Sequence, residues 1–276
     1  MPRTAVRIDA VAIETRAAEL ARRTFAGSAQ AIASDLVIAC MDLTTLEGRD
    51  TEESVRALCA RGIAPAPGAP HVAAVCVYPT HVRTVAAAVA GTSVRVASVV
   101  AAFPSAQSSL AVKLQETRDA LASGAHEIDM VIDRGAFLAG RDATVREEIE
   151  AVRAACGDAT LKVILEVGEL GSYAAIRRAC EIALAGGADF LKTATGKIDR
   201  SATPAIALVL CEAIAEHARS TGRLVGLKLS GGIRKVESAY AYVAIVDATL
   251  GDAWLCPQRL RIGASSLLDD LLTRRA

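Results

Sequence analysis

The sequence contains little lysine and has no net charge. Only six of its 31 basic residues are lysine, and 31 acidic residues balance them. Like charges form no blocks, so neither nucleic acid nor an anionic membrane is an expected partner. No stretch reaches the ~18 uninterrupted apolar residues of a membrane span, and charges interrupt the N-terminal segment, unlike the apolar core of a signal peptide. We therefore expect a cytoplasmic protein that binds a small molecule.

Common nucleotide, hydrolase and metal motifs are also missing. The chain has no G-x-G-x-x-G after a first strand, no P-loop and no G-x-S-x-G, which argues against dinucleotide-binding, NTPase and α/β-hydrolase functions. Its seven cysteines form no C-x-x-C pair, which is typical of reduced cysteines that pack inside an intracellular protein. Its four histidines lack metal-ligand spacing, so we expect neither a metal nor a cofactor.

Eight apolar, β-branched runs alternate with alanine-rich helical segments. This alternation predicts an α/β protein with a parallel sheet, and eight repeats favour a closed (β/α)8 TIM barrel. Apolar residues at helical spacing over 8–24 predict an amphipathic N-terminal extension. We therefore divide the chain into a helical extension, 1–34, and one barrel domain, 35–276. The predicted strands are 36–43, 71–78, 94–101, 126–132, 161–167, 189–194, 224–230 and 259–264.

Two lysines lie late in neighbouring predicted strands, where TIM barrels carry their catalytic residues. They are Lys192 and Lys228, and strand parity turns them toward Asp129 if all three face the barrel interior. Two nearby ammonium groups repel, and burial also favours the neutral amine. Unlike arginine, a neutral lysine attacks a carbonyl to form a Schiff base, while an aspartate moves protons through water. These residues predict a metal-free lysine aldolase.

Three further ionisable residues lie in or at the ends of predicted strands. Asp42 ends the first strand, Glu166 ends the fifth, and Lys162 shares the face of Glu166. A strand lysine can also extend its amine to solvent, and an aspartate–lysine pair can be a purely structural ion pair. We favour this structural interpretation for any one lysine alone, and the catalytic one for Lys192 and Lys228 together.

Loops rich in glycine and hydroxyl groups follow the last three predicted strands. Glycine exposes backbone N–H groups, and in TIM barrels the loops after the seventh and eighth strands often bind phosphate. The glycines of GGI (231–233), taken alone, are equally consistent with an ordinary turn. Three such loops side by side favour a phosphate site made of Gly196, Lys197, Gly231, Gly232, Ser265 and Ser266.

Taken in order along the chain, the motifs resemble the deoxyribose-phosphate aldolase family. The resemblance implies a (β/α)8 barrel that reversibly cleaves 2-deoxy-D-ribose 5-phosphate into D-glyceraldehyde 3-phosphate and acetaldehyde through a lysine Schiff base, in deoxynucleoside catabolism. Family members often form dimers, so a homodimer is expected. The motifs are MDLTTL (41–46), CVYP (76–79), EIDMVI (127–132), LKVILEVGEL (161–170), DFLKTATGK (189–197), LKLSGGIR (227–234) and RIGASSLL (261–268).

The resemblance also implies a role for each matching residue. Lys192 would form the Schiff base, Lys228 would lower the pKa of Lys192, and Asp129 would act as acid and base through water. Lys162 and Asp42 would support the proton relay, and the six loop residues above would hold the phosphate. Lys113 and Lys235 are left as ordinary surface charges.

The sequence departs from the family pattern only beside these residues. The departures are Ala194, Leu229 with Ser230, Asp133 and FPSA (103–106), of which Leu229 and Asp133 are candidates for changes in loop geometry or substrate preference. Two alternatives stay open: another Schiff-base lyase or transaldolase acting on a different phosphorylated sugar, and a catalytically silent barrel that binds a sugar phosphate.

Overall fold

A closed barrel of eight parallel strands forms the centre of the computed structural model, which describes residues 8–23, 25–198 and 202–275. The strands follow one another in chain order, and β8 pairs with β1. The predicted TIM barrel is therefore confirmed. The strands are β1 (Met41–Thr44), β2 (Ala74–Val77), β3 (Arg95–Val100), β4 (Glu127–Val131), β5 (Thr160–Ile164), β6 (Phe190–Lys192), β7 (Gly226–Ser230) and β8 (Leu260–Ala264).

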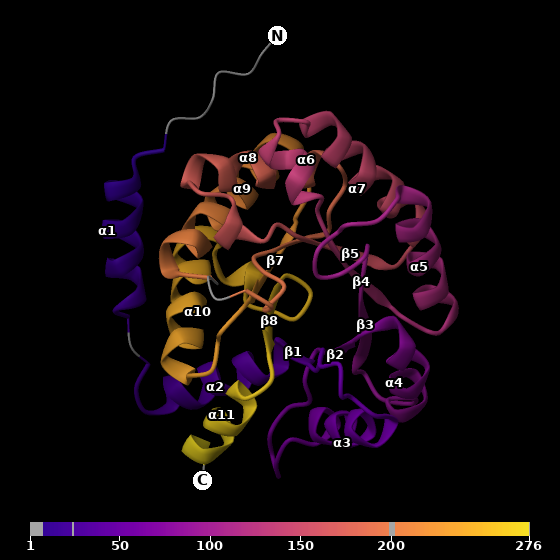
Figure 1. The fold of residues 1–276 in the computed structure, drawn as a ribbon. Helices are drawn as coiled ribbons and strands as arrows, with labels where there is room; N and C mark the ends of the chain where they lie inside the picture. The colour runs from indigo at the N-terminus through magenta and orange to yellow at the C-terminus, as the bar shows by residue number, and fades with distance from the viewer. Residues whose placement is uncertain (1–7, 24, 199–201, 276) are drawn as a thin grey trace.

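Helices surround the strands as a ring (Figure 1). Because side chains alternate along a strand, each strand turns one set outward against these helices and the other into the barrel. On β5, Leu161 and Val163 join the main apolar core, whereas Lys162 points inward to the ionic cluster described below. The helices are α1 (Ala10–Ala21), α2 (Ser28–Ala39), α3 (Glu52–Ile63), α4 (Val82–Ala88), α5 (Leu110–Ala122), α6 (Arg134–Leu138), α7 (Asp142–Cys156), α8 (Tyr173–Ala185), α9 (Pro204–Thr221), α10 (Val236–Leu250) and α11 (Leu267–Arg275).

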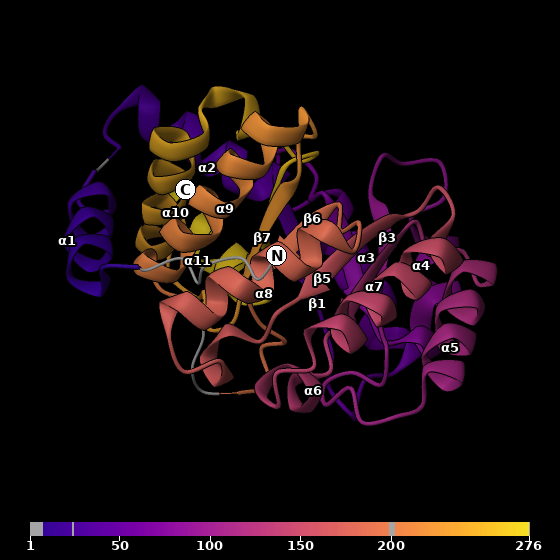
Figure 2. The same ribbon diagram turned by 90° about the horizontal axis from the view of Figure 1, so that it is seen from above.

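The N-terminal helix α1 lies outside this ring, against α9 and α10 (Figures 1 and 2). Asp9 caps it by accepting a hydrogen bond from the backbone N–H of Ala12, and it buries Ile13 and Ala17. The predicted amphipathic helix is confirmed. Residues 34 and 35, between which the extension and the barrel were divided, both lie within α2.

The predicted first strand, 36–43, is wrong in its first half. Residues 36–39 end α2, and β1 begins only at Met41. Val37 and Ile38 are fully buried where α2 packs against α10 and α11. A short apolar run that is buried in a helix has the same pattern as a buried strand, so periodicity does not separate the two.

Lys113 is not the surface charge that the sequence suggested. It lies on the face of α5 turned toward α7, is fully buried, and forms an ion pair of 2.8 Å with Glu148. Lys235 is largely exposed and pairs with Asp270 at 3.1 Å, so for it the prediction is confirmed. All seven cysteines are free thiols and six are buried, as expected of packing residues.

Candidate active site

Three lysines converge on one carboxylate inside the barrel. Strand pairing sets Lys192 of β6 beside Lys228 of β7, and Asp129 of β4 beside Lys162 of β5. The Nζ atoms of Lys192 and Lys228 both lie 2.7 Å from Oδ2 of Asp129, and Nζ of Lys162 lies 2.7 Å from its Oδ1. All four side chains are buried. The structure thus brings together four of the five residues predicted to be catalytic.

The fifth residue, Asp42, joins the same cluster from β1. Its Oδ2 lies 2.5 Å from Nζ of Lys228 and 3.4 Å from Nζ of Lys162. Its Oδ1 accepts a 2.6 Å hydrogen bond from the guanidinium of Arg261 on β8. Asp42 therefore connects the lysines to an arginine that the sequence analysis did not select.

A second carboxylate was missed as well. Glu127 accepts hydrogen bonds of 2.9 and 2.7 Å from Arg261 and lies 2.6 Å from Nζ of Lys162. A signal for both residues was present in the sequence, because Glu127 precedes Asp129 by two positions and Arg261 lies two positions before Gly263 in the same strand, β8. Strand parity applied to every charged residue would have turned both inward.

The surroundings shift the pKa values of the two neighbouring lysines, Lys192 and Lys228, in opposite directions. Burial and then the Lys228 ammonium lower the pKa of Lys192, although Asp129 opposes them. Burial also acts to lower the pKa of Lys228, but Asp129 and Asp42 outweigh it and raise that pKa above its ordinary value. Lys192 is therefore the amine that more readily becomes neutral, while Lys228 stays charged.

The central carboxylates stay ionised despite their burial. Burial acts to raise the pKa of Asp129, but Lys162, Lys192 and Lys228 together hold it well below the usual value. For Asp42, burial is outweighed in the same way by Lys228 and Lys162, so its pKa is also lowered. Asp129 is thus an ionised carboxylate that accepts hydrogen bonds from all three lysines.

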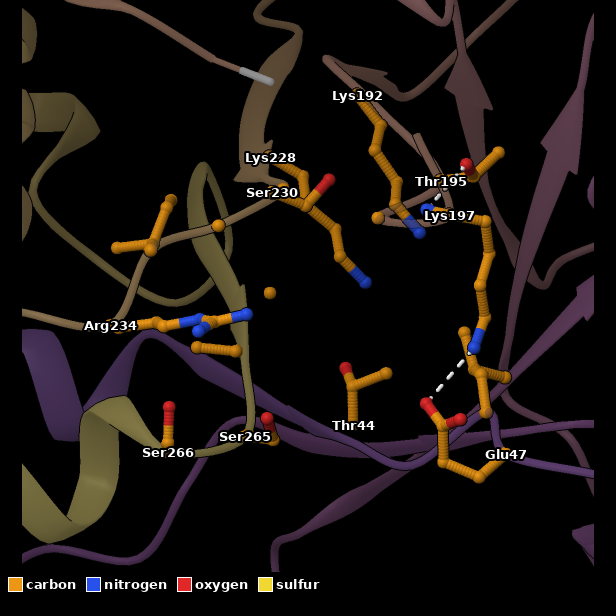
Figure 3. Close-up of a pocket in the computed structure, with 17 residues that line it drawn as sticks. Thr44, Glu47, Lys192, Thr195, Lys197, Lys228, Ser230, Arg234, Ser265 and Ser266 are labelled. Carbon is orange, nitrogen blue, oxygen red and sulfur yellow. Dashed lines mark hydrogen bonds and ion pairs between the residues drawn. The ribbon is translucent and has the colours of Figure 1, made fainter. Parts of the chain in front are cut away.

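A cavity of about 230 Å³ opens directly above Lys192 and Lys228. Figure 3 shows both amines reaching into it, with Arg234, Ser265 and Ser266 on one side and Lys197 beside Glu47 on the other. Asp129 contacts both amines, Asp42 contacts that of Lys228, and Lys162 contacts both carboxylates, but none of these three residues lines the cavity. All six residues predicted to hold phosphate line the cavity: Gly196, Lys197, Gly231, Gly232, Ser265 and Ser266.

The loop after β7 presents its backbone to this cavity. Gly231 and Gly232 have φ of 98° and 72°, a left-handed backbone that favours glycine. Ser265 and Ser266 lie directly before α11, whose N-terminus adds positive potential to the same wall. Arg234 and Thr44 also line the cavity, although the sequence analysis did not choose them.

Glu166 lies outside the ionic cluster, contrary to its expected place at a strand end. β5 stops at Ile164, and Glu166 has φ of 51° ahead of a short turn. Its buried carboxylate accepts hydrogen bonds from Thr195, 3.1 Å from the backbone N and 2.5 Å from Oγ1. Glu166 therefore holds the loop that carries Gly196 and Lys197.

The departures from the family pattern have local structural roles. Leu229 turns outward into the core between barrel and helices, away from the cavity. Asp133 caps α6, since its side chain accepts a 2.9 Å hydrogen bond from the N–H of Ala136. The hydroxyl of Ser230 donates a 2.6 Å hydrogen bond to the carbonyl of Ala194.

Comparison with known proteins identifies the family. The sequence model of the protein family described as DeoC/LacD family aldolase matches residues 36–273 of this chain. The chain belongs to this family. It is therefore an aldolase, a carbon–carbon lyase, and the family resemblance predicted from the motifs is confirmed.

Similar proteins cover nearly the whole chain. The mouse and human proteins named deoxyribose-phosphate aldolase are 40% and 39% identical over 280 residues, covering 96% of this chain and 88% of each relative. The tetrameric structure of deoxyribose phosphate aldolase from Aeropyrum pernix is 28% identical, with a TM-score of 0.68, and covers 88% of this chain and 92% of that one. Within the described ranges, no helix has the length and apolar character needed to cross a bilayer.

Proposed function

We propose that this aldolase cleaves 2-deoxy-D-ribose 5-phosphate reversibly into D-glyceraldehyde 3-phosphate and acetaldehyde, with Lys192 as the Schiff-base residue. The observation that carries the proposal is the shared contact of Lys192 and Lys228 with Asp129 at the floor of the cavity. The names of the relatives support the choice of substrate.

The first half of the reaction forms the Schiff base. The neutral Nζ of Lys192 attacks the aldehyde carbon C1 of the open-chain sugar and gives a carbinolamine. Protonation of its hydroxyl releases water and leaves an iminium ion. Asp129 exchanges these protons through a water molecule, and Lys162 and Asp42 complete the relay through their contacts with Asp129 and Lys228.

The second half breaks the carbon–carbon bond. Removal of the proton from the C3 hydroxyl turns that carbon into the aldehyde of glyceraldehyde 3-phosphate, and the C2–C3 electrons move into the iminium ion to give an enamine. A proton returned to C2 regenerates an iminium ion. Its hydrolysis by water releases acetaldehyde and frees Lys192.

The phosphate binds to the loops after β6, β7 and β8. Backbone N–H groups of the glycine loop and the serine hydroxyls suit phosphate oxygens, and Lys197 adds a positive charge. The proposed phosphate residues are six of those that line the cavity: Gly196, Lys197, Gly231, Gly232, Ser265 and Ser266.

The biological setting is part of the same proposal. The reaction belongs to deoxynucleoside catabolism in the cytoplasm, and needs neither metal nor cofactor because the Schiff base is itself the electron sink. We expect a homodimer, with residues 1–34 as an extension of the barrel domain at 35–276. Size-exclusion chromatography with light scattering measures the oligomeric state.

Borohydride trapping tests the proposal. Acetaldehyde and borohydride are expected to add one ethyl group to Lys192 of the wild-type protein, detected by peptide mass spectrometry. Lys192→Arg should abolish both adduct and turnover, because a guanidinium stays charged. Lys235→Arg, on the exposed surface, is the matched control and should retain both. A wild type without the adduct, or an active Lys192→Arg, would contradict the assignment.

Two assays separate the alternatives. Release of acetaldehyde distinguishes this activity from that of a lyase or transaldolase acting on another phosphorylated sugar. Turnover by the free enzyme distinguishes it from a silent sugar-phosphate-binding barrel.

A further inference from the structure

A buried ion pair lies beneath the lysine cluster. Arg261 and Glu127 form two hydrogen bonds of 2.9 and 2.7 Å, and their side chains are 6% and 2% exposed. Neither lines the cavity, so neither contacts a bound substrate. The ring of Phe190 lies 5.6 Å from the guanidinium, and a Cβ on Gly226 would overlap that ring. Little space is left for water at this level, so these charges interact through a poorly screened medium.

Each member of this pair contacts a different part of the catalytic cluster. Arg261 donates to Oδ1 of Asp42, whose Oδ2 holds Lys228. Glu127 contacts Lys162, which in turn holds Oδ1 of Asp129. Two short chains of contacts therefore lead from Arg261 and Glu127 to Asp129, the carboxylate that Lys192 contacts.

The charges of the seven buried side chains in the cluster balance only when Lys192 is neutral. Four cations, Lys162, Lys192, Lys228 and Arg261, face three anions, Asp42, Glu127 and Asp129. A neutral Lys192 leaves three of each sign. From the remaining strands, Cys76 of β2 is a buried thiol whose pKa is raised by burial, and Arg95 of β3, half exposed, lies 3.8 Å from Glu127.

We propose that Arg261 and Glu127 are positioning residues that control how readily Lys192 loses its proton, Arg261 by favouring the neutral amine and Glu127 by opposing it. The inference rests on the proposed function, because it concerns the Schiff-base role of Lys192. If Arg261 and Glu127 formed only a structural pair, replacing either one would lower stability, but the two replacements would not shift the pH profile of Lys192 in opposite directions.

The two substitutions have opposite expected signs. Arg261→Met removes a positive charge, so the Lys192 ammonium is stabilised and the pH profile moves to higher pH. Glu127→Gln removes a negative charge, so the ammonium is destabilised and the profile moves to lower pH. Shifts of about one pH unit are expected when a single charge is removed from the same buried cluster as Lys192. The double variant restores the charge balance and should return the profile close to that of the wild type.

The measurement is the pH dependence of borohydride trapping of acetaldehyde on Lys192, accompanied by kcat/KM. Trapping does not require cleavage of the sugar phosphate, so it follows Lys192 directly. Lys113→Met and Glu148→Gln are the matched controls, because they break a buried lysine–carboxylate pair between α5 and α7. They should lower the melting temperature and leave the profile unchanged.

The outcomes separate this inference from the proposed function. If the wild type is trapped but the two single variants shift in the same direction or not at all, the inference is overturned and the proposed function stands. If the wild type is not trapped, both fall. Should the neutral variants fail to fold, Arg261→Lys and Glu127→Asp keep the charges and are expected to keep the profile. A shift in these conservative variants would overturn the inference.

Discussion

Lys192 and Lys228 direct their amines at the same carboxylate oxygen, Oδ2 of Asp129, each at 2.7 Å. Lys228 has a second carboxylate, Asp42, at 2.5 Å. Among the ion pairs of the described residues, Lys192 has Asp129 alone. One oxygen shared between two ammonium groups compensates neither fully, so the amine with the single partner is the one that loses its proton more easily. The difference between the two lysines thus comes from Asp42.

Replacing Lys228 tests this difference. Lys228→Leu removes the neighbouring ammonium and leaves Asp129 to Lys192, so the pKa of Lys192 should rise. The pH–rate profile of kcat/KM is then expected to shift to higher pH, with a loss of activity at neutral pH of about tenfold or more. Lys235→Leu on the surface is the control. An unchanged profile in Lys228→Leu would contradict the role of Lys228.

Replacing Asp129 tests the proton relay. Asp129→Asn keeps the size of the side chain but cannot take up a proton, so kcat should fall by roughly 10²- to 10⁴-fold. Lys192 should keep its position in this variant, so its trapping by acetaldehyde and borohydride should be retained in part. Comparing kcat with the extent of trapping separates the two effects. Near-normal kcat would exclude Asp129 as the acid and base.

Glu47 is expected to compete with the substrate phosphate for the Lys197 ammonium. The two side chains form an ion pair of 2.9 Å at the edge of the cavity, with Glu47 largely exposed. Glu47→Gln should lower the KM for deoxyribose 5-phosphate by about two- to fivefold, as expected for an exposed pair. The KM for unphosphorylated deoxyribose should not change, and Lys197→Met should raise only the KM of the phosphorylated sugar. Equal changes for both sugars would contradict this competition.

Gly263 gives the stem of Lys228 its space. A Cβ at this position would lie 3.0 Å from Cβ of Ser230 and 3.2 Å from Cε of Lys228. Gly263→Ala should therefore displace the amine and lower kcat, by about tenfold or more since positioning errors near 1 Å are costly. Gly48→Ala, where no atom lies within 4 Å of the added Cβ, is the control. Equal kcat values in the two variants would contradict this role of Gly263.

The sequence allowed the barrel and its central residues to be predicted because both depend on local periodicity. Alternating runs fix the number of strands, and parity brings Lys192, Lys228 and Asp129 to one interior. The contact of Arg261 with Asp42 was beyond this reasoning, because it depends on the pairing of β8 with β1 that closes the barrel. The partner of Lys113 likewise depends on how α5 packs against α7.

The ring of Phe190 beneath Arg261 has a consequence for the order of events. Because it fills the barrel beside Gly226, we expect reactants to reach Lys192 from the loop side, where the proposed phosphate residues line the cavity. In the proposed cleavage, the phosphorylated fragment would lie nearer this opening than the two-carbon fragment still bound to Lys192, and would therefore depart first. In synthesis the two-carbon aldehyde must enter first. The kinetics are therefore expected to be ordered, with acetaldehyde as the last product to leave.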